Sequence, residues 1–136
     1  MKVLTMKTLI VEDNFPSRVL LQTFLSRYGE CHIAVNGKEA VEAFRLAIDN
    51  GSPYDLICMD ILMPEMDGKE AVRQVRAQEQ ERGIRSTDSV KIIMTTAAED
   101  IKEVIQSFQA LCDAYLFKPI DMLELLRNLK ALGLLR

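Results

Sequence analysis

The sequence predicts an α/β fold, a doubly wound five-stranded parallel sheet covered by helices on both faces as a three-layer sandwich. Short apolar runs alternate with longer segments of helical period, the pattern of such sheets. The 136 residues, 49% of them hydrophobic, suit one domain with one core. We expect this domain over residues 6–136, with residues 1–5 as a short N-terminal extension because Met6-Lys7 resembles a second start.

The strands are predicted where aliphatic and β-branched residues gather in short runs. These runs are TLIV (8–11), CHIAV (31–35), DLICM (55–59), VKIIMT (90–95) and AYLF (114–117). A segment of helical period separates most runs from the next, and connections of that kind join parallel strands.

The first helix is expected to follow Asn14, a capping residue, with Pro16 in its opening turn. Gly29 would stop it. Its buried stripe is expected to consist of Val19, Leu20 and Phe24, with Leu21 and Leu25 as further candidates.

The second helix is expected to start at Asn36, where Glu39 three positions later resembles a capping box. Its apolar face would be Val41, Phe44 and Ile48, and the Asn-Gly-Ser-Pro run at 50–53 breaks the chain.

Three further helices are predicted, over about 69–81, 100–110 and 121–132. In the last, Asp121 and Glu124 have the spacing of a capping box. The segment at 76–89 is polar with mixed charge, so we expect a solvated helix end and loop without a function.

Composition excludes several classes of function. The net charge of −3, with both signs interspersed, gives no basic stripe for nucleic acid or an anionic membrane. No apolar run approaches the roughly 20 residues that span a bilayer. The three cysteines (Cys31, Cys58 and Cys112) are odd in number and far apart, so we expect reduced core residues of a cytoplasmic protein. The single histidine, His32, is expected to be structural.

Polar residues gather where the predicted strands end, and ligands of open parallel sheets bind at that edge. They are Glu12, Asp13, Asn14, Asp60, Thr95, Thr96, Lys118 and Pro119. Singly, each is an ordinary turn, cap or strand-end residue. Together, three neighbouring acids would repel one another unless a hard cation such as Mg²⁺ neutralised them. Thr96 and Lys118 suit phosphoryl oxygens, so the set favours phosphoryl transfer to an aspartate.

Four motifs carry a family resemblance over about residues 6–135: LIVEDN (9–14), MDILMPEMDG (59–68), TTA (95–97) and FKP (117–119). Together they resemble the receiver domains of two-component response regulators. The resemblance implies a flavodoxin-like sheet in the order 2-1-3-4-5.

The resemblance also implies roles for single residues. Asp60 would accept a phosphoryl group from a sensor histidine kinase, a histidine phosphotransfer protein or a small phosphodonor. Mg²⁺ would be held by Glu12, Asp13, the Asp60 carboxylate and the Leu62 carbonyl. Phosphoryl oxygens would be held by Thr96 and Lys118.

Pro64 and Gly68 match the family's loop that shapes the site, and the resemblance implies a cis peptide at Lys118-Pro119, an isomer found in only about 5% of X-Pro bonds.

Signalling would follow from the aromatic residue at position 115. Tyr115, three residues before Lys118, matches the family's switch position, although a static core tyrosine is the alternative for such a residue. When Thr96 moved toward the phosphoryl group, Tyr115 would turn inward and change the face built from the fourth helix, fifth strand and fifth helix. That face would bind a downstream effector protein. The chain would be a monomer or weak dimer and no enzyme in the usual sense, catalysing only its own aspartyl phosphorylation and dephosphorylation.

Two apolar residues, Leu62 and Ala98, stand where other receivers carry polar groups that orient an attacking water. We therefore expect a comparatively long-lived acyl phosphate.

Other functions fit less well. A haloacid-dehalogenase phosphatase or a metal-dependent nuclease or topoisomerase needs a second acid two residues after the first, where this chain has Leu62. A flavodoxin-like cofactor binder wants a phosphate-cradling loop rich in Ser, Thr or Gly after the first strand. The nearest alternative is a phosphorylation-independent receiver-like interaction module, which would require the loss of an acid, Thr96 or Lys118.

Overall fold

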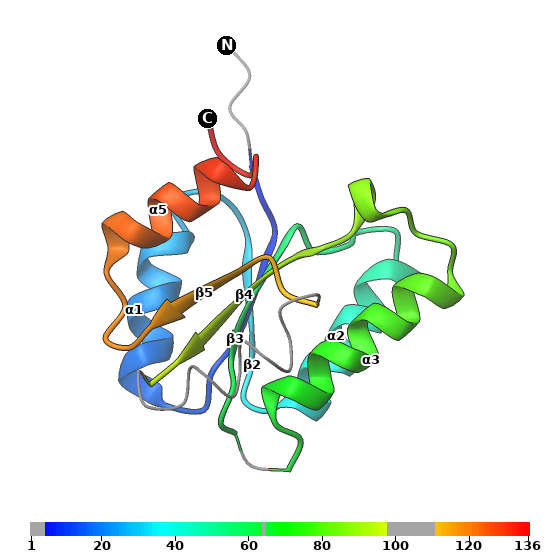
Figure 1. Cartoon of the computed structure of the whole chain (residues 1–136), viewed down its shortest axis with the longest axis horizontal. Helices are drawn as coiled ribbons and strands as arrows, with labels where there is room; N and C mark the ends of the chain where they lie inside the picture. The colour runs from blue at the N-terminus through cyan, green and yellow to red at the C-terminus, as the bar shows by residue number, and fades with distance from the viewer. Residues whose placement is uncertain (1–4, 64, 98–110) are drawn as a thin grey trace.

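The computed structural model describes residues 5–63, 65–97 and 111–136, so the helix expected over 100–110 lies outside the described residues. Five parallel strands form one sheet in the order β2-β1-β3-β4-β5, which confirms the expected order (Figure 1). The strands are β1 (Thr8–Val11), β2 (Cys31–Ala34), β3 (Leu56–Asp60), β4 (Lys91–Thr96) and β5 (Ala114–Phe117).

Helices cover both faces of the sheet, as predicted for a three-layer sandwich. One face carries α1 (Phe15–Leu25) and α5 (Met122–Ala131), and the other carries α2 (Gly37–Asp49) and α3 (Gly68–Glu81) (Figure 1). A short 3-10 helix, η1 (Ser86–Asp88), precedes β4. Within the described ranges, no helix has the length and apolar character that crossing a membrane requires.

The core is divided by the sheet into two clusters, because successive strand residues point to opposite faces. Met59 and Met94 belong to the cluster beneath α2 and α3. Cys58 and Ile93 belong to the cluster beneath α1 and α5. Asp60, two positions after Cys58, therefore faces the α1 and α5 side at the carboxyl end of β3.

Side chains cap the helices where the sequence predicted them. The Asn14 side chain accepts a hydrogen bond from Ser17 N at 3.0 Å, and the Asn36 side chain accepts one from Glu39 N at 2.8 Å. The Asp121 side chain accepts from Leu123 N at 2.8 Å. These bonds satisfy amide groups that a first helical turn leaves free. The predicted strand and helix boundaries mostly differ from those observed by one residue.

The buried face of α1 was predicted correctly only in part, because Phe24 packs against the core but two of the expected residues do not lie inside. Val19 and Leu20 are 41% and 50% exposed, whereas Leu21 and Leu25 are buried. Leu21 and Leu25 are four residues apart and so share one side of the helix, and both belong to the core cluster on the sheet face that α1 and α5 cover. Because apolar residues occur all around this helix, periodicity alone could not select the face. The solvent-facing side of α1 is therefore apolar.

The segment at 76–89 was expected to be solvated, and Arg76 and Glu79 depart from that expectation. The Arg76 guanidinium donates to Leu111 O and Val90 O, both at 2.9 Å. It also pairs with Glu79 at 2.6 Å and with Asp113 at 3.1 Å. Glu79 is only 4% exposed. The cluster therefore ties α3 to the start of β4 and to the segment that leads into β5.

Candidate functional site

The ends of three strands bring the predicted charged residues together. The Lys118 ammonium lies 2.8 Å from Glu12 Oε2 and 3.2 Å from Asp60 Oδ2. Glu12, Asp13 and Asp60 each have one carboxylate oxygen that lies within 4.8 Å of those of the other two. The chain thus forms the predicted acidic cluster with its lysine.

The two acids after β1 differ in exposure. Glu12 is fully buried, and its Oε1 accepts a hydrogen bond from Asn14 N at 3.1 Å while Oε2 accepts one from Lys118. Asp13 is exposed. Glu12 is therefore a fixed internal anion, and Asp13 is the accessible one.

Asp60 is the last residue of β3 and is 7% exposed. Burial and the negative charge of Glu12 raise the pKa of Asp60 to about 6, against the opposing influence of Lys118. Burial by itself would lower the pKa of Lys118, but its hydrogen bond to Glu12 and the charge of Asp60 outweigh burial and raise that pKa. One ammonium therefore compensates the carboxylates only in part.

The loop after β3 is held tightly against Asp60. Gly68 N donates to Ile61 O at 2.9 Å, and a Cβ at Gly68 would lie 2.4 Å from the main-chain oxygen of Asp60. The Leu62 amide donates to Asp60 Oδ1 at 3.4 Å. Glycine is thus required at 68 by the close approach of two backbone segments. Pro64 lies outside the described residues, and the role of the Leu62 carbonyl stays a prediction.

The two residues predicted to switch lie on neighbouring strands. Thr96 is 2% exposed and its hydroxyl donates to Ala97 O at 3.3 Å. The Tyr115 ring packs against the cluster beneath α2 and α3, with its hydroxyl buried. Burial raises the pKa of Tyr115, and the neighbouring Cys112 thiol raises it further. The tyrosine thus already points inward in this structure, and its movement stays a prediction. Ala98 lies outside the described residues.

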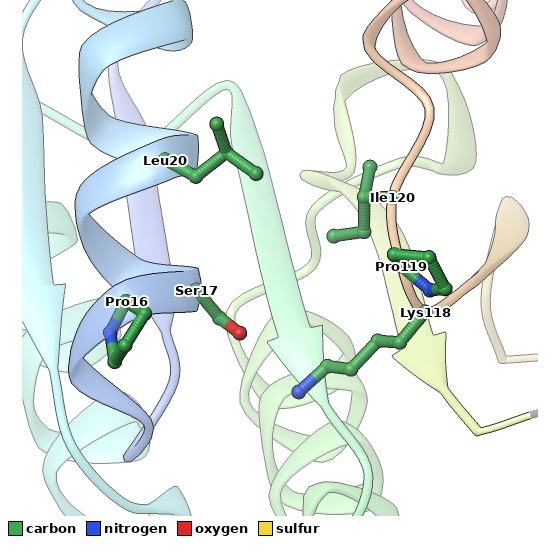
Figure 2. A pocket seen from close by; sticks show the side chains of 6 residues that line it. All are labelled: Pro16, Ser17, Leu20, Lys118, Pro119 and Ile120. Atoms are coloured by element: carbon green, nitrogen blue, oxygen red, sulfur yellow. The ribbon is translucent and has the colours of Figure 1, made fainter.

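A groove beside Lys118 was not foreseen from the sequence. Figure 2 shows α1 on one side and the segment after β5 on the other, with the Lys118 side chain reaching into the space between them. The lining residues are Pro16, Ser17, Leu20, Lys118, Pro119 and Ile120. The Lys118-Pro119 peptide is cis, as the resemblance implied. The surplus of apolar residues on α1 was the only signal in the sequence for this groove.

The residues present fit a magnesium ion. Glu12, Asp13 and Asp60 supply only carboxylate oxygens, the ligands that Mg²⁺ prefers. Burial and the charge of Glu12 raise the pKa of Asp60, and a divalent cation beside it would stabilise its ionised form. His32, in contrast, lies on β2 with its Nδ1 2.7 Å from the Tyr54 hydroxyl and belongs to no such cluster among the described residues.

A family model described as the response regulator receiver domain matches residues 8–130. The chain belongs to this family. The receiver domain is 35% identical over 125 residues to the transcriptional regulatory protein SrrA of Staphylococcus aureus, a match that covers 91% of this chain and 46% of SrrA. The chain spans only 12% to 46% of the length of the curated relatives that it matches first.

Solved receiver domains have the same fold. The receiver domain of yeast Ssk1, crystallised with the histidine phosphotransfer protein Ypd1 of Saccharomyces cerevisiae, is 30% identical with a TM-score of 0.78 over 98% of this chain and 92% of that one. The receiver domain of sensor histidine kinase PA1611 of Pseudomonas aeruginosa is 30% identical with a TM-score of 0.74, over 95% and 98% of the two chains. That structure has a magnesium ion coordinated in its active site cleft.

Proposed function

We propose that this receiver domain takes a phosphoryl group onto Asp60 and signals through the change that follows at its surface. One observation carries the proposal. The Lys118 ammonium contacts both Glu12 and the buried Asp60 at the strand ends, with exposed Asp13 beside them. A buried carboxylate that is only partly compensated is suited to react once a cation and a phosphoryl donor arrive.

The reaction is a displacement at phosphorus. An oxygen of the Asp60 carboxylate forms the new bond to phosphorus, while the bond from phosphorus to the donor breaks and its electron pair leaves with the donor. Lys118 stabilises negative charge on the phosphoryl oxygens, and Thr96 donates to one of them. Glu12, Asp13 and Asp60 would hold Mg²⁺, which would supply further neutralisation of that charge. The chain catalyses its own modification, and the donor leaves without its phosphoryl group.

The donor is proposed to be a protein, a sensor histidine kinase or a histidine phosphotransfer protein. Lys118 both lines the groove of Figure 2 and contacts Asp60, so a partner seated there has its donor group close to the acceptor. Leu20 lines the groove, and α1 carries two further exposed apolar side chains, Val19 and Phe15, the latter 65% exposed. Such a patch is typical of a protein interface. The complex of a yeast receiver with a phosphotransfer protein supports this choice of partner.

The signal is proposed to pass to another protein through the face that includes β5 and α5. Phe117 on β5 and Leu123 on α5 are 42% and 65% exposed. Tyr115 lies two residues before Phe117 on β5. Its ring packs on the α2 and α3 face of the sheet, whereas Leu116 packs on the opposite face. A movement of Tyr115 would therefore alter the strand that carries Phe117, and a downstream effector protein would read that change.

The test is to incubate the protein with acetyl phosphate and Mg²⁺ and measure its mass. We expect a gain of one phosphoryl group, abolished by Asp60→Ala or by EDTA, and retained by Asp88→Ala, a control at an exposed acid on η1. A chain that gains no phosphoryl group, or gains one in Asp60→Ala, would contradict the proposal. The interaction module that works without phosphorylation would then be the better description.

A further inference from the structure

A second threonine near the site has no assigned task. Thr95 is 2% exposed, and its hydroxyl has no hydrogen-bond partner in residues 5–63, 65–97 and 111–136. An unpaired hydroxyl in a core is unfavourable, and valine has the same shape without that cost. Packing alone therefore does not explain the hydroxyl at this position.

The sheet register places Thr95 beside the phosphoacceptor. Asp60 on β3 pairs directly with Thr95 on β4, so their side chains leave the sheet on the same face. On its other side Thr95 pairs with Leu116 of β5, which belongs to the cluster beneath α1 and α5. Lys118 follows Leu116 by two residues and reaches across β4 to Asp60 Oδ2 at 3.2 Å. Thr95 thus lies on the strand between the acceptor and its lysine.

The backbone at this point is already fixed. The main-chain oxygen of Thr95 accepts a hydrogen bond from Ile61 N at 3.1 Å, which anchors the residue after Asp60. A rotation about the Cα–Cβ bond moves the hydroxyl of a threonine from one staggered position to another without moving the backbone. The hydroxyl can therefore change its direction within the packed sheet.

We propose that Thr95 is a positioning residue for phosphoryl capture, whose hydroxyl donates to Asp60 once the phosphoryl group draws Lys118 away from it. The inference rests on the proposed function. One Asp60 oxygen forms the bond to phosphorus, and the donor leaves with the electron pair of the bond that breaks. The Thr95 hydroxyl keeps its proton throughout and donates to the oxygen that stays a carbonyl. The Thr95 hydroxyl thereby replaces the Lys118 ammonium, the hydrogen-bond donor that Asp60 loses to the incoming phosphoryl group.

This role separates stability from reactivity. In the free protein the hydroxyl is unpaired, so Thr95→Val raises the melting temperature. In the reaction the hydroxyl is used, so the same variant takes up phosphoryl more slowly. Thr95→Ser has the opposite pattern, because it loses a buried methyl group but keeps the donor. A residue with a role in packing alone would not raise the melting temperature and slow phosphoryl uptake in the same variant.

The experiment compares wild type, Thr95→Val and Thr95→Ser with acetyl phosphate and Mg²⁺, well below the melting temperature of every variant. We expect Thr95→Val to load about fivefold or more slowly, a typical effect of one hydrogen bond to a carbonyl oxygen. Thr95→Ser should recover most of the wild-type rate. Thr8→Val is the matched control, since Thr8 is also buried with an unpaired hydroxyl but stands at the opposite end of its strand.

The control should melt higher than wild type and load at the wild-type rate. Equal loading by Thr95→Val and wild type would overturn the inference, as would loading rates that follow melting temperature across the variants. Failure of the proposed function would look different, because the wild-type chain itself would then gain no phosphoryl group.

Discussion

Glu12 and Asp60 share one cation, the Lys118 ammonium, whose nitrogen lies 2.8 Å from Glu12 Oε2 and 3.2 Å from Asp60 Oδ2. This arrangement keeps two buried carboxylates together in the free protein. It also points the lysine at the atom proposed to react, so in the proposed reaction one side chain would serve both the resting and the phosphorylated states.

Lys118→Met should slow loading from acetyl phosphate on the order of 100-fold, since it removes a charge that stabilises the transferring group. Mg²⁺ should bind more tightly to the same variant, because a cation no longer repels it from the carboxylates. Mass spectrometry over time and titration calorimetry measure the two effects. Lys130→Met, at an exposed lysine of α5, should change neither. Loading at the wild-type rate would show that Lys118 has only a structural role.

Stability should depend on pH through Asp60. Its pKa is raised from 3.8 to about 6 on folding, so the folded protein binds the proton more tightly than the unfolded chain. The resulting stabilisation is full below pH 3.8 and is lost as the pH rises through about 6. The Asp60→Asn variant has no carboxyl group at this position and so does not lose this stabilisation. In EDTA, its unfolding free energy minus that of wild type should therefore increase between pH 4 and 7.5 by on the order of 1–3 kcal/mol. Urea unfolding at several pH values measures it, and a difference that stays constant with pH would contradict the assignment.

Arg76→Met should lower the unfolding free energy by about 3 kcal/mol, because it leaves a buried acid without its cation. That acid is Glu79, whose side chain is 5% exposed, and Arg76 also bonds the carbonyls of Val90 and Leu111. Urea unfolding at pH 7 measures the effect. Arg85→Met is the matched control, since its pair with Asp88 is exposed and should contribute less than about 0.5 kcal/mol. Equal effects of the two variants would mean that water reaches the Arg76 cluster.

The acidic site could be predicted from sequence because it depends on strand ends. Once Glu12, Asp60 and Lys118 are each placed at the carboxyl end of a parallel strand, the topology alone brings them to one edge. No side-chain detail is needed for that step. The family motifs then added the order of the strands.

Other features depend on contacts that the local sequence does not contain. The partners of Arg76 include main-chain oxygens 14 and 35 residues away, and a carbonyl has no residue type to recognise. Which side of α1 is exposed depends on how the helix is rotated about its axis against the sheet. Hydropathy does not decide that rotation, because Val19, Leu20 and Leu21 are all apolar. The position of Thr95 beside Asp60 required the register between two strands.

Leu62→Asn should speed the loss of phosphate from the phosphorylated protein by about tenfold, because an amide can orient a water for attack and leucine cannot. Leu62 lies two residues after the acceptor and is 61% exposed, so the substitution disturbs no core packing. Phosphate release after removal of acetyl phosphate measures the rate. Leu123→Asn is the matched control, a leucine of similar exposure on α5 that should leave the rate unchanged. If both variants lose phosphate at the wild-type rate, water already reaches the acyl phosphate, and the apolar residue at 62 does not set the lifetime of the signal.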